Sequence, residues 1–336
     1  MTTKEMLDRC FTDDTSMPES FIKKRTNIDK PLLFEYETEI GKQLVDMDVN
    51  EITELIFRNA KGNVQNQPYI AVSYVSQLAM MLRKIMKWYG DNIDLTHNNI
   101  FGNPKLKSKN LLMAVIKKAG RISWSDVEVL ISKLHNEPLM NWSVNGVDYT
   151  RADYVELVML LFYSGFSKQT EILEFKEVDL ENKSVVLPDR TVVLTDRTFE
   201  LLTAFHSQGA LPTPNRNTTI YHKLLSWHGS YFKFPVRQSQ VDVFDNRSET
   251  AMRNRISDTI QHWIGKTYSN GICMNALFWL GIHDRLAEKF GEDELRTMIL
   301  NHNQKDFQRL VSALNNSGVL HLSADSIMNN LLQFVI

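Results

Sequence analysis

The chain has 336 residues, of which 23% are charged, and its 38 lysines and arginines nearly balance 40 aspartates and glutamates, for a formal net charge of −2. This length favours two domains, and the composition is that of a globular protein. Two cysteines far apart, no apolar run of membrane-spanning length and no signal-peptide core argue against a disulfide framework, a cysteine-bound metal and a membrane protein. We expect a cytoplasmic protein without metal or cofactor.

Helical spacing of apolar residues predicts a helical domain over residues 1–140, after a polar lead-in at 1–30. Asp48 and Glu51 have the spacing of a capping box, which marks the start of a helix. Gly90 is expected to end the longest helix, and a segment of weak periodicity with Pro138 places the domain boundary near residue 140. The expected helices are 32–45, 52–60, 69–89, 109–119 and 124–135.

The second domain, 141–336, is organised around residues 153–194. An apolar helix at 154–163 follows a capping box of Thr150 and Asp153, and Gly165 breaks it. A short helix at 170–173 comes next, and then the apolar period changes to two residues. This change predicts three short strands joined by turn-like tripeptides, at 178–180, 184–187 and 191–194.

Further elements are predicted along the rest of this domain. A helix is expected at 196–207, a loop with two prolines at 209–217, and a helix at 249–264. Ser323 begins a final helix, whose large apolar residues must be buried. We expect that helix to pack on its own chain, and exchange with a neighbouring subunit is the open alternative.

The order of elements at 153–194 resembles the start of the catalytic domain of tyrosine recombinases, the phage integrases. In that family a helix ends in a Thr-Gly-Leu-Arg turn, and a Glu-Leu helix and a three-stranded sheet follow; the turn here is Ser164-Gly165-Phe166-Ser167. Residues 230–237 resemble the family's Tyr-Leu-Phe-Pro-x-Arg segment, and the N-terminal helices resemble its core-binding, SAM-like domain. The resemblance implies a mainly α fold with a small antiparallel β-sheet.

The resemblance also locates the catalytic positions, most of which hold the wrong residue. Lys168 takes the place of the first arginine if the turn slips by one residue, and His283-Asp284-Arg285 has the wrong spacing for the family's His-x-x-Arg box. The reaction needs a tyrosine nucleophile, so the resemblance implies a recombinase fold without recombinase chemistry, and we expect no enzymatic activity. Where the family has two arginines, a histidine and the tyrosine, this chain has Ser167, Leu280, His302 and Val311.

Basic residues are distributed unevenly along this nearly neutral chain. Residues 101–121 and 201–241 contain lysines and arginines and no acidic residue, which indicates a one-sided positive surface suited to duplex DNA. Both stretches fall where the family contacts DNA. Arg253 and Arg255 lie two residues apart on a helix, so they cannot both face one groove. The predicted DNA-binding residues are Lys84, Lys105, Lys107, Lys109, Lys117, Lys118, Arg121, Lys168, Arg190, Arg216, Lys223, Arg237, Arg253 and Arg255.

A protein that keeps the DNA-binding clamp of a recombinase but lacks its catalytic residues is expected to bind an operator. This resembles the integrase-like phage repressors of the SPβ type, which maintain lysogeny. The resemblance implies double-stranded DNA with operator-like repeats as the partner, a phage regulatory protein as a further candidate partner, and a monomer or weak oligomer. Two alternatives stay open: an active recombinase with Ser312 or Tyr268 as an unorthodox nucleophile, and a helical interaction module that does not bind DNA.

Overall fold

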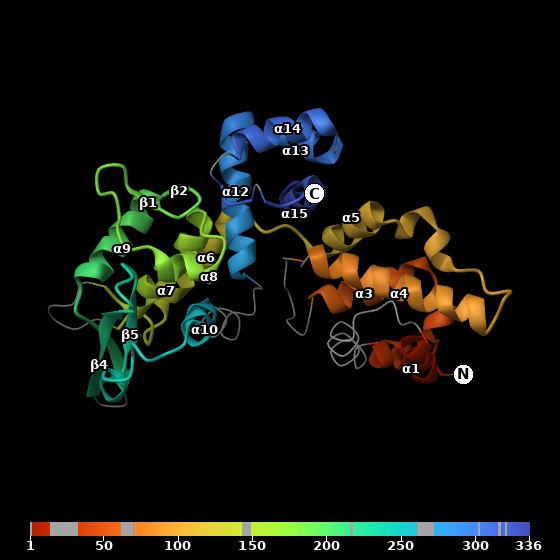
Figure 1. The fold of residues 1–336 in the computed structure, drawn as a ribbon, viewed down its shortest axis with the longest axis horizontal. Helices are drawn as coiled ribbons and strands as arrows, with labels where there is room; N and C mark the ends of the chain where they lie inside the picture. Colours follow the sequence, from red (N-terminus) through yellow and green to blue (C-terminus); the bar gives the residue numbers. More distant parts are fainter. Residues whose placement is uncertain are drawn as a thin grey trace. The chain divides into compact units, whose positions relative to one another are not determined.

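The computed structural model describes residues 2–13, 33–61, 70, 72–142, 149–215, 218–260, 272–301, 303–314, 317–319 and 321–336. It divides into two compact units, Met1–Arg121 and Ile122–Val335 (Figure 1). The division falls earlier than the expected boundary near residue 140, because helix α6 (Trp124–Asn136) packs on α7 (Arg151–Ser164) of the second unit. Among the described helices, none has the length and hydropathy needed to cross a membrane.

The first unit is helical throughout the part that the structure describes. It contains α1 (Thr3–Asp13), a helix at 33–40, α3 (Val49–Lys61), α4 (Val72–Asn92) and α5 (Ser108–Ala119). Short 3-10 turns lie between them: η1 (Leu44–Asp46), η2 (Ile100–Gly102) and η3 (Pro104–Leu106). The polar lead-in expected at 1–30 contains a helix, α1, because Met6, Leu7 and Cys10 form a buried face that packs against α4.

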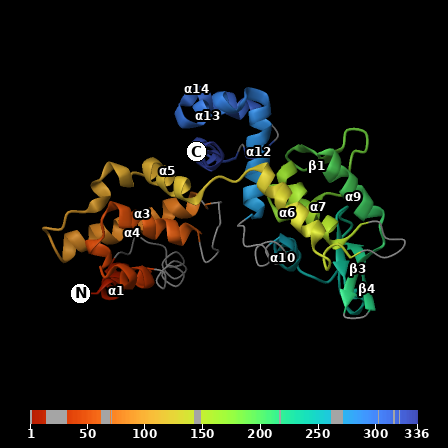
Figure 2. The same cartoon turned by 180° about the vertical axis from the view of Figure 1, so that it is seen from behind.

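Helix α7 is the centre of the second unit. It is apolar on all sides, and nearly every one of its residues is buried, as expected for a helix surrounded by other elements. It contacts α6, α9 (Asp196–Ser207), α10 (Glu249–Ile260) and α12 (Met274–Phe290). Figure 2 shows α6 and α7 side by side. The predicted capping box is present, with the Thr150 amide donating to Asp153 over 2.8 Å.

Two small antiparallel sheets flank this helical core. After α8 (Gln169–Glu174), the strands β1 (Ser184–Val186) and β2 (Thr191–Val193) form a hairpin. The third strand expected at 178–180 is reduced to an isolated bridge between Asp179 and Ser184. The second sheet has the order β3-β4-β5 and consists of β3 (Ala210–Asn215), β4 (Thr218–Ser226) and β5 (Lys233–Val236), followed by the 3-10 turn η4 (Gln238–Gln240).

The prediction of a loop at 209–217 was therefore wrong, because residues 210–215 form β3. Pro212 and Pro214 pair with Tyr221 and Thr219 of β4, and β3 lies at the edge of its sheet. Proline is tolerated on an edge strand because its missing N–H can face away from the sheet.

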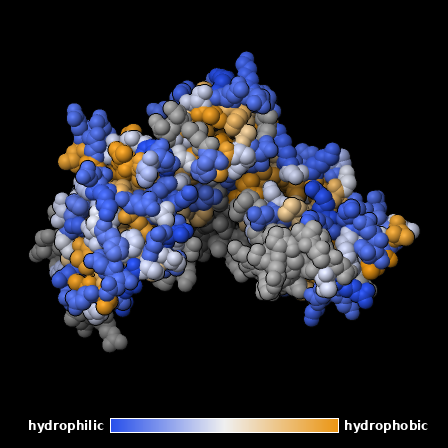
Figure 3. Space-filling model, viewed as in Figure 1, coloured by the Kyte–Doolittle hydropathy of each residue, from blue (hydrophilic) through white to orange (hydrophobic). Residues whose placement is uncertain are grey.

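The C-terminal part adds α13 (Glu292–Asn301), α14 (Gln304–Ala313) and α15 (Ala324–Val335). Helix α15 packs on α12 and α13 of the same chain, and the Phe334 ring lies 5.5 Å from that of His283. Its large apolar residues are buried against these helices, and packing in cis stays a prediction. The predicted fold class, mainly α with small antiparallel sheets, is confirmed. On the face seen in Figure 3 hydrophilic residues predominate, with separate small apolar areas.

Candidate nucleic-acid interface

The turn that follows α7 is built around one carboxylate. Gly165 ends the helix with φ 126°, a conformation that favours glycine. Ser167, expected at the position of the family's first arginine, donates from its amide and its hydroxyl to Glu171, over 2.6 and 2.7 Å. The amide of Lys168 also points to Glu171, over 3.4 Å, while its side chain is exposed. Glu171 thus holds the turn closed from the first turn of α8.

Arg190 occupies the interior of this turn and is not on a DNA-facing surface. Only 2% of its side chain is exposed. It donates to Glu171 over 2.8 Å, to the Gly165 carbonyl over 3.0 Å and to Asp189 over 2.9 Å. Gly318 covers the guanidinium so closely that a Cβ there would lie 2.5 Å from Cζ. The prediction of Arg190 as a DNA contact is corrected, because a buried charge needs these partners and cannot leave them cheaply.

Arg285 reaches the same turn from α12. It donates to the carbonyls of Tyr163 and Ser164, over 3.0 and 3.3 Å, and burial lowers the pKa of its guanidinium. Leu280, which is expected from the sequence at the family's second arginine position, is buried. The spacing argument missed that an arginine five residues later approaches the turn. A cavity of about 370 Å³ lies here, lined by Gly165, Arg285, strand β2 and the end of α14.

No tyrosine or histidine lines that cavity among the residues that the structure describes. Val311 is half-buried on α14, and the neighbouring Ser312 donates its hydroxyl to the Gln308 carbonyl over 2.9 Å. The hydroxyl of Tyr163 donates to Asp284 over 2.8 Å, and burial and this carboxylate raise the pKa of Tyr163. His302 and Tyr268 lie outside the described residues.

The predicted DNA-binding residues of the first unit lie at its surface. Lys118 pairs with Glu54 and lies over the Phe57 ring, and Lys84 is half-buried on α4. The others lie on α5 or just before and after it, in a stretch of sequence without acidic residues, although Glu54 of α3 reaches Lys118. The exposed members of the set are Lys105, Lys107, Lys109, Lys117, Lys118 and Arg121.

The predicted residues of the second unit divide by exposure. Lys223, Arg237 and Arg253 are exposed, whereas Arg216 lies outside the described residues. Arg255 is half-buried and donates to the Pro235 carbonyl over 2.7 Å. Arg253 and Arg255 thus point in different directions on α10, as the helical geometry requires.

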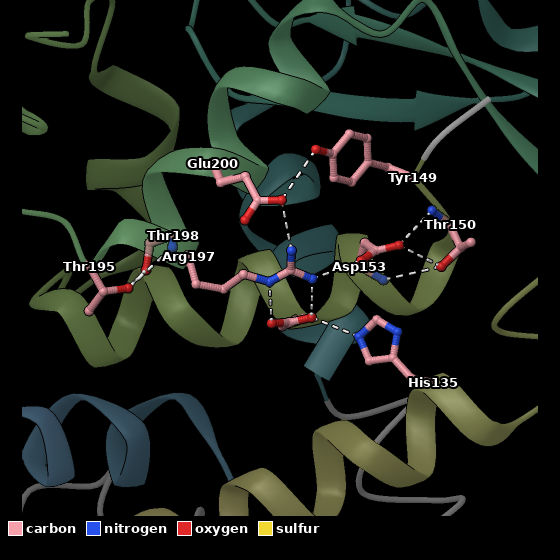
Figure 4. A network of polar contacts seen from close by, with 9 residues as sticks. His135, Tyr149, Thr150, Asp153, Thr195, Arg197, Thr198 and Glu200 are labelled. Carbon is pink, nitrogen blue, oxygen red and sulfur yellow. Dashed lines mark hydrogen bonds and ion pairs between the residues drawn. The ribbon is translucent and has the colours of Figure 1, made fainter. Parts of the chain in front are cut away.

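A polar network fixes α6 to α7 and α9, and the sequence did not reveal it (Figure 4). Arg197 of α9 donates to Asp153 over 3.0 Å and to both oxygens of Glu156, over 2.9 and 3.0 Å. His135 of α6 lies 2.7 Å from Glu156, and Arg197 also donates to Glu200 over 3.0 Å. The capping box identified Asp153, but nothing in the pattern indicated its second partner on α9.

The charges of this network stabilise one another. The hydrogen bond with Glu156 raises the pKa of His135, against the effect of burial. Burial acts to raise the pKa of Glu156, but the bonds from His135 and Arg197 leave it below its ordinary value. His135, Asp153 and Glu156 offer ligand atoms within 4.8 Å of one another, as a metal site would. Because Arg197 pairs with both carboxylates and His135 also pairs with Glu156, we interpret the group as a helix anchor.

Comparison with known proteins gives structural likeness only. No family model and no curated protein matches the chain. Three solved structures of the Tn1549 transposon integrase (amino acids 82–397) are similar to it. The first, in complex with circular intermediate DNA, is 11% identical, with 97% of each chain covered and a TM-score of 0.36. A variant with circular intermediate DNA is 12% identical, with 98% of this chain and 95% of that chain covered and a TM-score of 0.36. A second variant, with transposon right end DNA, is 11% identical, with 98% of this chain and 94% of that chain covered and a TM-score of 0.38. At these TM-scores the chains do not superpose closely.

Proposed function

We propose that this protein is a sequence-specific duplex-DNA-binding repressor, built on an inactive tyrosine-recombinase architecture, that keeps a prophage in lysogeny. The observation that carries the proposal is the closed turn after α7. Ser167 stands where the family has a phosphate-binding arginine, and both Ser167 and Arg190 are bound to Glu171. A recombinase needs unpaired cations here to stabilise a phosphorane. Glu171 therefore pairs with Arg190 inside the turn and accepts the hydrogen bonds of Ser167, which supports binding without cleavage.

The order of elements supports the architecture. A capped apolar helix, a glycine turn, a short helix and a β-hairpin follow one another as in the catalytic domain that the sequence resembles. A helical unit precedes them, and it carries exposed basic residues on α5 and on the turns before it. Such residues neutralise phosphates and release counterions, which supplies affinity for duplex DNA.

The test of the missing chemistry uses DNA that the protein itself selects. Genomic fragments retained by the protein are sequenced, and a duplex of the recovered site is nicked so that any covalent intermediate is trapped. We expect site-specific retention and no covalent adduct, and we expect Ser167→Arg to yield none either. An active tyrosine recombinase with its own site serves as the positive control. An adduct on a tyrosine or serine would refute the proposed inactivity, and absence of retention at low salt would favour an interaction module.

The test of the DNA surface uses salt dependence. Replacing Lys105, Lys107 and Lys109 together by alanine should weaken binding to the recovered site and to a scrambled duplex alike. The log–log slope against salt should flatten by roughly 0.9 per lost phosphate contact. A control with the same loss of charge replaces exposed Lys4, Lys87 and Lys289. Equal slopes in the two triple variants would contradict a role for this surface.

A further inference from the structure

A second cavity, of about 430 Å³, lies in the second unit at the N-terminal end of α7. Arg151 of α7, His222 of β4 and Arg255 of α10 enter it from three different elements. Tyr154 and Phe234, both buried, give it an apolar wall. Its volume is within the range of small-molecule sites, and its lining combines apolar surface with a few convergent polar groups.

The polar groups that converge on this cavity are cationic and partly removed from water. Arg151 donates to the Thr213 hydroxyl over 2.8 Å, and Arg255 donates to the Pro235 carbonyl over 2.7 Å. Burial lowers the pKa of both guanidinium groups, although arginine stays charged at any ordinary pH. Burial, with Arg151, Arg237 and Arg255 nearby, also lowers the pKa of His222. The cavity therefore has a positive potential that solvent only partly screens.

The nearby carboxylates do not cancel this potential. Asp153 and Glu156 of α7 are already bound to Arg197, and Glu156 also to His135. Asp258 lines the cavity but is exposed, so water screens its charge. An anion that enters between Arg151 and Arg255 would recover part of the hydration energy that these groups lost on burial.

We infer that this cavity binds a phosphoryl group, held by Arg151 and Arg255, with the rest of the ligand against Tyr154 and Phe234. The planar guanidinium matches the geometry of phosphate oxygens, and two of them on different elements can bind one phosphoryl group together. The ligand is a small phosphate ester or a phosphate of the DNA backbone, and these sources share one chemistry. The inference goes beyond the proposed function, because a small phosphate ester would give the protein an effector site.

The experiment measures binding of inorganic phosphate and adenosine 5′-monophosphate to the full chain by calorimetry, with adenosine as the uncharged control. Arg151→Gln and Arg255→Gln should each weaken binding of both anions about tenfold or more, as expected for losing a charged hydrogen bond. Arg253→Gln removes an exposed arginine from the same helix and should leave both affinities unchanged. Thermal unfolding of each variant verifies that it is folded.

The second arm repeats the DNA titration with saturating adenosine 5′-monophosphate, against sodium chloride of equal ionic strength. If adenosine 5′-monophosphate weakens DNA binding, the cavity is a binding site for a backbone phosphate. If DNA binding is unchanged or tighter, the cavity is a separate effector site. Either outcome supports the inference. It is overturned if neither anion binds at about 10 mM, or if Arg253→Gln weakens binding as much as the two cavity variants do.

Discussion

Two arginine sites near the ends of α7 differ in the groups that the guanidiniums contact. At the C-terminal end, Arg190 is buried and paired with Glu171 and Asp189. At the N-terminal end, Arg151 and Arg255 donate to a hydroxyl and a carbonyl beside an open cavity. The first arrangement uses a cation to close a turn, and the second presents cations to a ligand. Counting arginines along the sequence cannot separate these roles, because the roles depend on the groups that each guanidinium contacts in the fold.

The largest expected effect comes from removing the carboxylate that closes the C-terminal turn. Glu171→Ala leaves Arg190 buried with one charged partner fewer, and loss of one member of a buried ion pair costs roughly 3–5 kcal/mol of unfolding free energy. Chemical denaturation measures the change. Glu174→Ala, at an exposed position on the same short helix, should change stability by less than about 0.5 kcal/mol. Similar losses in both variants would show that Glu171 does not hold the turn.

A smaller effect is expected from the close approach of α12 to the same end of α7. A Cβ on Gly281 would lie 1.9 Å from the Tyr163 carbonyl oxygen, so the two helices must separate to accommodate Gly281→Ala. Overpacking of this kind costs about 1–3 kcal/mol. Gly102→Ala meets nothing within 4 Å and serves as the control in thermal unfolding. If both variants melt like the parent protein, this helix contact is less tight than the structure indicates.

The smallest effect concerns the anchor at the N-terminal half of α7, and it depends on pH. The pKa of His135 is raised on folding. Its contribution to the free energy of unfolding is therefore present below the unfolded pKa and disappears as the pH rises through the folded pKa. His135→Gln should therefore cost roughly 1–2 kcal/mol near pH 5.5 and less near pH 8.5. Melting curves at both pH values measure this difference. His321→Gln, at an exposed position, is the control for the loss of an imidazole elsewhere in the chain.

Most of the helices could be predicted from the sequence because their signals are local. Capping boxes and apolar spacing predicted α3, α5, α6, α7 and α9 with small errors at the ends. The failures have physical causes. Helix α1 has few apolar residues and depends on α4 to cover them, and α4 itself continues through Gly90 because neighbouring packing outweighs a weak helix breaker.

The candidate site was less accessible to sequence reasoning, because its contacts join residues far apart in the chain. The glycine turn and Ser167 could be located by motif, but the pairing of Arg190 with Glu171 required the hairpin to fold back onto α8. The approach of Arg285 depends on how α12 lies against α7. The cavity role of Arg151 and His222 could not be predicted, because one arginine and one histidine far apart in the chain form no recognisable motif.

The prolines of β3 limit how copies of this protein can associate. Pro212 and Pro214 lie two residues apart on the edge strand, so both present their missing N–H on the same side. An incoming strand from another molecule would find no hydrogen-bond donor at these positions, and the sheet cannot readily be extended there. Assembly of several copies along DNA would then have to use side-chain surfaces, which leaves this edge protected from aggregation.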